Sequence, residues 1–511
     1  MRVRGFIVRR WHLLATCALA ALLRLPAVFN GLPYVAHPDE PTNYRVFHTM
    51  VENASALPHF YRYPSLLFDL QALTHGALVF VGRLFGVWSP SDLLGLNGDA
   101  GPGSHLVQSR PTWVVARLVI VAVSVAGAVL VAGVARRMTS SRVAGFVAGA
   151  LASTSAISIA SGSSITPDAL AGTMAFAVIV MALQPVMGSL RDDVALRRWA
   201  ITTGVILGLA TAAKYNNAVL AVPLAAAIGL MPDRARVTWR HMGLVAGMGV
   251  VAFTLATPGL VFDTTKFVED LGYELRHYST GHDGAEGASF VTNLKFLWRS
   301  DAVAVVLAIV GLALRRSLAM MLLAVWPVTY LLVIGATEVR FARNLTPLLG
   351  CIAVLAAVGT YELAKLVRRR HAFVIAAVCL APLVVLSTID LANNFRRDVT
   401  DHHGAARRWL EDHVDPGSRV LADYYTPWLN RNRWEVTSTP FAVEQTDLRL
   451  YGTIVITSTG SGRFLSERTK YGYQARRIEA LRSSACRVDR YDDSFGFWIE
   501  VLVMSCPADG E

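Results

Sequence analysis

Two adjacent carboxylates, Asp39 and Glu40, lie in the segment HPDEPTNY, a few residues after the first long apolar stretch of the chain. A carboxylate at an apolar surface can take a proton from a hydroxyl group, which is the task of a general base. Asp39 could instead cap a helix beginning in EPTNYRVFHTM, because Asp is a good N-cap and Pro41 suits a first helical turn. Capping does not exclude catalysis, so Asp39 and Glu40 are both candidate catalytic residues.

Basic side chains occur beside other apolar stretches. Lys214 lies in AAKYNNA, and Arg340 and Arg343 lie three residues apart in EVRFARNLTP. On a helix this spacing would place both guanidinium groups on one face, where they could hold one phosphate. Lys214 could instead extend to lipid headgroups, and the two arginines could pair with Glu338 or Asp168.

Five further polar residues in similar positions are candidates for substrate binding: Arg62, Tyr63, Asp168, His277 and His282. Asp168 follows a proline at the start of an apolar stretch, where a carboxylate often caps a helix. The histidines lack the HxH or HxxxH spacing that is typical of metal sites. We therefore expect no metal and no other cofactor.

Membrane helices must position these residues. The chain has 511 residues, of which 53% are hydrophobic and only 17% are charged. It has too few charged residues to cover the surface of an ordinary soluble protein. Stretches able to cross about 30 Å of hydrocarbon predict about eleven spans. They lie near residues 12–30, 112–134, 143–161, 168–186, 199–213, 216–231, 242–260, 301–314, 318–335, 345–364 and 371–391.

The distribution of Lys and Arg among the connections predicts which side of the membrane each connection of this polytopic helical protein faces. If residues 64–86 do not span, the short cytoplasmic connections hold 15 Lys and Arg residues, against Lys214, Arg340 and Arg343 in the short outer ones. We therefore expect 64–86 to lie on the outer leaflet, within a long first exoplasmic loop of interfacial helices from about 31 to 111. The N-terminus is then cytoplasmic, the C-terminus is outside, and every candidate residue lies on the exoplasmic face.

The sequence pattern changes near residue 393, where long apolar stretches give way to short runs with helical or strand-like spacing. AARRWLEDHV has helical spacing, and SRVLADYY, RWEVTS, GTIVITSTG and FGFWIEVLVMSC resemble strands. We predict a transmembrane domain over 1–392 and a small exoplasmic α/β domain over 393–511. Cys486 and Cys506 could pair there or remain free. The net charge of +11 comes from short basic clusters between apolar stretches, which does not indicate a nucleic-acid partner.

Five motifs in order carry a family resemblance: HPDE, RYPSLL, TPDALAGTMAFAV, GLATAAKYNNAVLAVPLAAA and RFARNLTPLLGCIAVLAAVG. With them, the chain resembles the bacterial branch of the C-type (GT-C) membrane glycosyltransferases. These are similar to the protein O-mannosyltransferases and the lipid A aminoarabinose transferase. The resemblance implies Asp39 as the catalytic carboxylate with Glu40 as its companion, and Lys214 with Arg340 or Arg343 as the family's basic positions. Ser65 departs from the pattern, because the family commonly has proline there.

The resemblance implies an inverting glycosyltransferase of the plasma or inner membrane. The donor would be a hexose or pentose on a polyprenyl phosphate, whose leaving phosphate needs cations, and the acceptor would be a hydroxyl of a glycan, a lipid or a protein. The alternative functions are a transporter or lipid flippase, and a membrane scaffold. A transporter is expected to show matching halves and charges near mid-membrane, whereas these charges gather at one interface.

Overall fold

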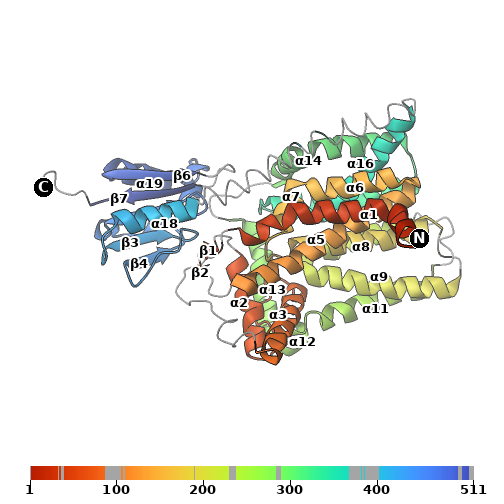
Figure 1. Cartoon of the computed structure of the whole chain (residues 1–511), viewed down its shortest axis with the longest axis horizontal. Coiled ribbons are helices and arrows are strands. Elements are labelled where there is room, and N and C mark those ends of the chain that lie inside the picture. Colours follow the sequence, from red (N-terminus) through yellow and green to blue (C-terminus); the bar gives the residue numbers. More distant parts are fainter. Residues whose placement is uncertain are drawn as a thin grey trace.

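The computed structural model of the chain describes residues 2–30, 32, 34–35, 39–86, 105–106, 110–188, 190, 192–229, 237–282, 289–366, 381, 385, 402–492 and 498–505. It consists of a helical unit ending at Leu366 and a smaller α/β unit beginning at His402 (Figure 1). The predicted domain boundary at 392/393 lies outside the described residues, as does almost all of the predicted span 371–391.

Among the described residues, six helices are long and apolar enough to cross a membrane. These segments are Arg10–Phe29 in α1 (Arg2–Arg24) and η1 (Pro26–Phe29), α5 (Arg110–Thr139), α8 (Asp168–Val186), α14 (Ser289–Leu314), α15 (Leu318–Gly335), and Ala342–Leu366 in η4 (Ala342–Leu345) and α16 (Thr346–Leu366). The polytopic helical fold is confirmed, whereas the count of about eleven spans is not.

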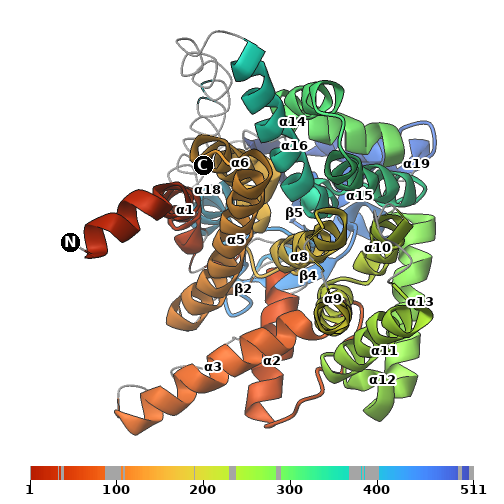
Figure 2. The same ribbon diagram turned by 90° about the vertical axis from the view of Figure 1, so that its right-hand side faces the viewer.

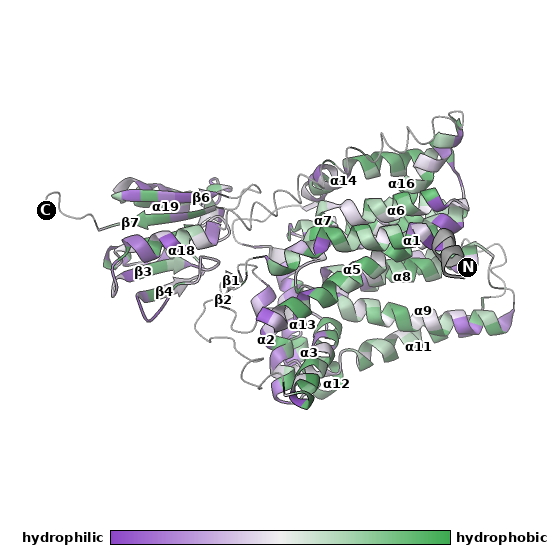
Figure 3. Cartoon of the chain, viewed as in Figure 1, coloured by the Kyte–Doolittle hydropathy of each residue, from purple (hydrophilic) through white to green (hydrophobic). Residues whose placement is uncertain are grey.

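Shorter or more polar helices occupy the other predicted spans. The stretch 143–161 is divided into α6 (Arg142–Thr154) and α7 (Ala156–Ser161), because Ser155 leaves the helical conformation and its hydroxyl caps α7 through the Ser158 amide. The remaining stretches form α9 (Asp193–Ala213), η2 (Tyr215–Leu220), α10 (Ala221–Gly229) and α11 (Trp239–Leu255). Figure 3 shows the apolar character of the bundle and the mixed polarity of the α/β unit.

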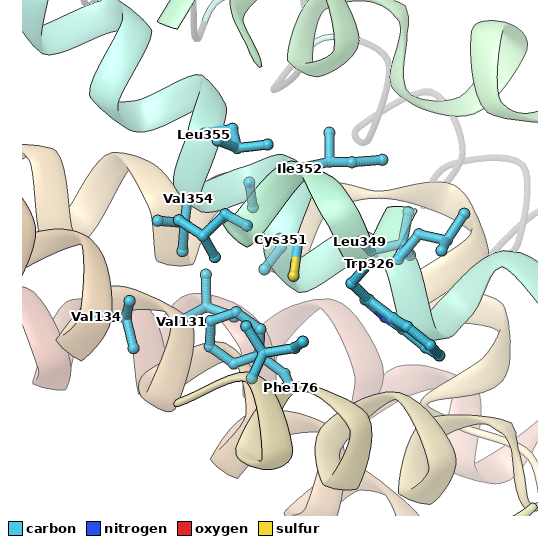
Figure 4. Close-up of a cluster of buried hydrophobic side chains, with 14 of the residues drawn as sticks. Val131, Val134, Phe176, Trp326, Leu349, Cys351, Ile352, Val354 and Leu355 are labelled. Carbon is cyan, nitrogen blue, oxygen red and sulfur yellow. The ribbon is translucent and has the colours of Figure 1, made fainter. Parts of the chain in front are cut away.

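Helix α16 forms the centre of the bundle. It contacts α5, α6, α8, α14 and α15, and nearly every residue of its first four turns is buried. A helix that is apolar all round requires such surroundings. Figure 4 shows Leu349, Cys351 and Val354 of α16 among side chains that include Phe176 and Trp326.

Several helices at one end of the bundle run across the spanning helices. Helix α9 is seen lengthwise in Figure 1 and end-on in Figure 2, whereas α3 (Leu66–Leu84) and α13 (Thr264–Thr280) lie crosswise to it. Leu73 and Phe80 on α3 and Leu275 on α13 are more than half exposed. Exposed apolar faces on crosswise helices suit a membrane surface, which is the arrangement predicted for residues 64–86.

The α/β unit contains one five-stranded sheet in the order β4-β3-β5-β7-β6. β3 is parallel to β4 and β5, whereas β7 is antiparallel to β5 and β6. Alternate residues of β3 face two separate cores, one under each flanking helix. The elements are α18 (His402–His413), β3 (Arg419–Asp423), β4 (Glu435–Thr439), β5 (Thr453–Thr457), α19 (Gly472–Ser484), β6 (Arg487–Asp492) and β7 (Trp498–Val503).

The predicted α/β domain is thereby confirmed, although the sequence patterns did not identify α19 or β6. Cys486 is disulfide-bonded, and Cys506 lies outside the described residues.

Helices α14 and α16 approach each other closely at Gly311 and Gly359. A Cβ on Gly359 would meet the carbonyl oxygen of Leu307, which is backbone and cannot move aside. We therefore expect Gly359→Ala to destabilise the protein by roughly 1–3 kcal/mol, as overpacking of a tight contact does. Thermal unfolding in detergent would measure the change. Gly247→Ala on α11 is the control, because a Cβ there meets nothing within 4 Å, and equal effects of the two variants would contradict the prediction.

Candidate functional site

A cavity of about 210 Å³ lies at the end of the helical unit where the crosswise helices gather. It is lined by Asp39, Thr42, Asn43, Phe60, Arg62, Tyr63, Pro167, Asp168, Lys214, Tyr273, Glu274, His277, Tyr278, His282, Val339, Phe341, Arg343 and Asn344. Eight of the ten predicted site residues are therefore brought together. Glu40 and Arg340 are the two that do not line the cavity.

Ion pairs connect the charged groups of the cavity in a chain of alternating sign. Arg343 Nη1 lies 2.6 Å from Asp39 Oδ2, and its Nε lies 3.9 Å from Asp168 Oδ2. Lys214 Nζ lies 2.7 Å from Asp168 Oδ1 and donates a second hydrogen bond to Asn344 Oδ1 at 2.7 Å. Lys214 and Asp168 are almost fully buried, whereas Asp39 and Arg343 are about a quarter exposed. The two outer members can therefore meet a ligand.

Glu40 holds this arrangement in place from outside the cavity. Its carboxylate accepts hydrogen bonds from Arg117 Nε at 2.9 Å and Nη2 at 2.6 Å, and from the amide of Ile165 at 2.8 Å. Asn43, on the same helix α2 (Glu40–Glu52), donates to the carbonyl of Ile165 at 2.7 Å. These bonds join the start of α2 to the segment preceding Asp168, which suits Glu40 to positioning its neighbour Asp39, while the expected catalytic role of Glu40 stays a prediction.

Asp39 occupies the N-cap position of α2, as the alternative interpretation expected, but its side chain makes no capping hydrogen bond. Its carboxylate is directed instead toward Arg343. Similarly, Asp168 begins α8 without acting as a simple cap, because both of its oxygens face cations.

Arg340 does not line the cavity and instead contacts the α/β unit. Its Nη1 lies 3.6 Å from Glu467 Oε1. Arg340 and Arg343 do not share a helical face, because residues 339–341 precede η4 in non-helical conformation. Of the two arginines predicted to hold one phosphate, only Arg343 therefore lines the cavity.

Contacts with α13 and with the start of η2 position the loop that carries Arg62 and Tyr63. The amide of Tyr61 donates to Asp270 Oδ2 at 2.8 Å, and the Tyr215 hydroxyl donates to the Tyr61 carbonyl at 2.8 Å. Arg62 stacks over the ring of Tyr273, 3.8 Å from its centroid. Ser65 is fully buried at the N-cap of α3, so its departure from proline does not displace Tyr63 from the cavity.

Besides the predicted His277, one face of α13 supplies three cavity residues that motif matching did not identify, Tyr273, Glu274 and Tyr278. Tyr273, Glu274, His277 and Tyr278 all line the cavity, at the three- and four-residue spacing of a helical face. His277 packs against His282, whose ring meets Phe341. The same spacing, counted back from His277, could have identified Glu274 in the sequence.

Burial sets the proton affinity of several groups in the cavity. It raises the pKa of Glu274 to about 7, although the positive charges of Lys214, Arg62 and Arg343 oppose the rise. Burial lowers the pKa of His277, and burial together with His277 lowers that of His282 to about 4. At neutral pH His282 is therefore uncharged, and Glu274 is partly protonated.

Within the part of the chain that the structure describes, no group of three or more His, Cys, Asp or Glu residues is placed to hold a metal ion. The acids of the cavity instead face basic side chains. The expectation of a metal-independent site stays a prediction.

Comparisons with known proteins identify the fold. Residues 104–262 match the family model described as dolichyl-phosphate-mannose-protein mannosyltransferase. No curated protein sequence matches the chain. The structure is similar to that of ArnT from Cupriavidus metallidurans in the apo state, with a TM-score of 0.57 and 13% identity over 99% of this chain and 100% of that chain.

ArnT from the same organism bound to undecaprenyl phosphate gives a TM-score of 0.55 and 12% identity over 99% of each chain. At this identity the likeness to ArnT establishes the fold alone. Together with the family model, it confirms the resemblance to the C-type membrane glycosyltransferases.

Replacing Glu40 should test its positioning role. Glu40→Gln leaves the buried Arg117 guanidinium without its counter-charge, and breaking a buried pair in this way costs about 3–5 kcal/mol. We expect a lower unfolding temperature, and the double variant Glu40→Gln/Arg117→Met should recover part of the loss. Glu52→Gln is the control, because that side chain is 44% exposed at the other end of α2. An inactive Glu40→Gln protein of unchanged stability would restore the catalytic assignment.

The raised pKa of Glu274 predicts a pH-dependent stability. A carboxyl that keeps its proton in the folded state contributes stability at low pH, and this contribution is lost as the pH rises through about 7. Glu274→Gln should therefore unfold at a higher temperature than the wild type at about pH 8, with the difference vanishing below about pH 5. Glu269→Gln is the control, because its side chain lies on the same helix and is 69% exposed. A difference that is independent of pH would contradict the assignment.

Proposed function

We propose that this chain, which has the fold of the C-type membrane glycosyltransferases, transfers a sugar from a polyprenyl phosphate to an acceptor hydroxyl at the exoplasmic membrane surface. The observation that carries the proposal is the single cavity in which Asp39 and Asp168 meet Lys214 and Arg343 at one end of the bundle. A gathering of charge at one end favours an enzyme over the alternative of a transporter or flippase, whose sites are expected near mid-membrane.

The charge of the cavity suits a phosphodiester. Three carboxylates and three cations line it, and the raised pKa of Glu274 leaves that carboxyl partly protonated near neutral pH. The fraction with a protonated Glu274 carries one net positive charge, which complements the single negative charge of a sugar phosphodiester. Two charges form on the phosphate when the sugar leaves, so cations already in place stabilise the leaving group more than the donor.

In the proposed reaction, Asp39 accepts the proton of the acceptor hydroxyl. The acceptor oxygen then attacks the anomeric carbon from the side opposite the phosphate. The bond between that carbon and the phosphate oxygen breaks, and the electron pair leaves with the lipid phosphate. Attack from the opposite side inverts the anomeric centre.

Arg343 and Lys214 are the cations that we assign to the phosphate. Arg343 is suited to the first contact, because it is partly exposed and its guanidinium already bridges the two aspartates. Lys214 is more deeply buried, and its pairing with Asp168 keeps it charged. Its charge therefore adds to the positive potential at the buried side of the cavity. Undecaprenyl phosphate bound to the similarly folded ArnT supports a lipid phosphate as ligand.

The remaining cavity residues would receive the sugar. Arg62, Tyr63, His277 and His282 can donate or accept hydrogen bonds with sugar hydroxyls. We propose a hexose or pentose as the sugar, a hydroxyl of a glycan, lipid or protein as the acceptor, and no metal cofactor.

The orientation follows the charge asymmetry of the connections. Figure 1 shows the start of α1 and the α/β unit at opposite ends of the bundle. This supports a cytoplasmic N-terminus, an exoplasmic α/β unit and residence in the plasma or inner membrane.

Asp39→Asn tests the proposal. We expect purified protein to consume polyprenyl-phosphate sugars presented as a panel, and Asp39→Asn to lower turnover at least about 100-fold, because general-base catalysis contributes that much or more. Asp412→Asn, on the exposed side of α18, is the control. EDTA should leave the rate unchanged. A fully active Asp39→Asn protein would rule out the assigned base, and strict EDTA sensitivity would rule out a metal-free site.

A further inference from the structure

The α/β unit meets the helical unit beside the cavity. The Arg340–Glu467 ion pair, 3.6 Å long, joins them three residues before Arg343. On the α/β side, Glu467 follows η8 (Ser461–Leu465), which carries Arg463. This contact places the segment after β5 next to the basic end of the cavity.

Two side chains of the α/β unit lie within electrostatic reach of the cavity. Burial raises the pKa of Tyr425, with Arg463 and Arg343 opposing the rise and Asp39 and Tyr273 adding to it. In the other direction, the positive charge of Arg463 contributes to the lowered pKa of His282. Tyr425 therefore lies within electrostatic range of Asp39 and Arg343, and Arg463 lies within electrostatic range of His282.

The sheet presents both residues from one edge. β3 and β5 are adjacent and parallel, so the segments that follow them emerge together, at the edge where open α/β sheets bind ligands. Asp423, the last residue of β3, ties the two segments together. Its carboxylate accepts from the amides of Thr457 and Ser461, at 2.9 and 2.7 Å, and from the Ser461 hydroxyl at 2.7 Å.

Tyr425 is held in an unusual backbone conformation at this edge. Its φ is +69°, a region that aromatic residues seldom adopt and that is often retained at functional sites. His403 contacts the Tyr425 carbonyl at 3.2 Å, and the Thr457 hydroxyl donates to the carbonyl of Tyr424 at 3.3 Å. The surrounding unit therefore maintains a strained residue whose side chain is within electrostatic range of Asp39.

We propose that Tyr425 and Arg463 form the acceptor subsite of the enzyme and that this subsite binds a glycan. This inference rests on the proposed glycosyltransferase function. An inverting transfer requires acceptor and phosphate on opposite sides of the anomeric carbon. The lipid phosphate comes from the membrane, so the acceptor approaches Asp39 from the side that the α/β unit covers. An aromatic ring packs on the apolar face of a sugar, and a neighbouring guanidinium donates hydrogen bonds to its oxygen atoms.

Neither residue lies among the groups that line the donor cavity. We therefore assign both residues to positioning the acceptor rather than to binding the donor. Their removal should weaken acceptor use without weakening the binding of the lipid phosphate. This separation distinguishes an acceptor subsite from a general contribution to the site.

The test uses the full-length protein in native membranes with a radiolabelled polyprenyl-phosphate sugar. Tyr425→Ala and Arg463→Ala should each lower transfer into the glycan fraction at least about tenfold, the effect of losing one interaction with a charged or aromatic group. Binding of polyprenyl phosphate and the slow hydrolysis of donor by water should remain at wild-type levels. Tyr473→Ala and Arg468→Ala are matched controls, because both side chains are exposed on the same unit.

Unchanged transfer in both variants would overturn the proposal. So would an equal loss of polyprenyl-phosphate binding, or wild-type label that enters protein rather than glycan. Failure of the underlying function gives a different result, because wild-type protein would then consume no donor at all.

Discussion

The buried ion pair between Arg117 and Glu40 is the interaction on which the site depends. Arg117 grips both carboxylate oxygens and also donates to the carbonyls of Val28 and Asn30, at 2.9 and 2.8 Å. Glu40 in turn accepts from the amide of Ile165. A single guanidinium thus fixes the exit of α1, the start of α2 and the segment before α8 relative to α5. Its five donors in a rigid fork make arginine suited to this task, which a lysine could not perform.

The alternating charges of the cavity follow from that framework. Asp39 and Asp168 are held on either side of Arg343, and Lys214 compensates the deeper carboxylate. Burying such charged groups is costly unless each is paired, so the network that we propose for catalysis also constrains the fold. Under the proposed function, a ligand phosphate that enters the cavity would take over interactions that the carboxylates satisfy in its absence. Glu274 adjusts the total charge by retaining a proton.

The crosswise helices complete the cavity that the spanning helices leave open, and the α/β unit meets the helical unit beside it. Helix α13 presents a polar face to the cavity and an apolar face outward, so one amphipathic helix serves both the site and the membrane surface. The α/β unit contributes the strand ends that carry Tyr425 and Arg463. Donor and acceptor would then be received by different parts of the chain, a lipid by the helical bundle and a glycan by the sheet edge.

The membrane class, the α/β tail and most of the charged residues of the cavity could be predicted from the sequence. Those features depend on local composition, apolar length and the cost of charge near a membrane, all of which can be read along the chain. Tertiary structure alone decided how the charges pair. Adjacent residues Asp39 and Glu40 diverge because a helix turns successive side chains by about 100°, and Arg340 and Arg343 part because their segment is not helical. The pairs join residues that are 46 positions apart for Lys214 and Asp168, 77 for Arg117 and Glu40, and more for Arg343 and Asp39, and no local pattern specifies such contacts.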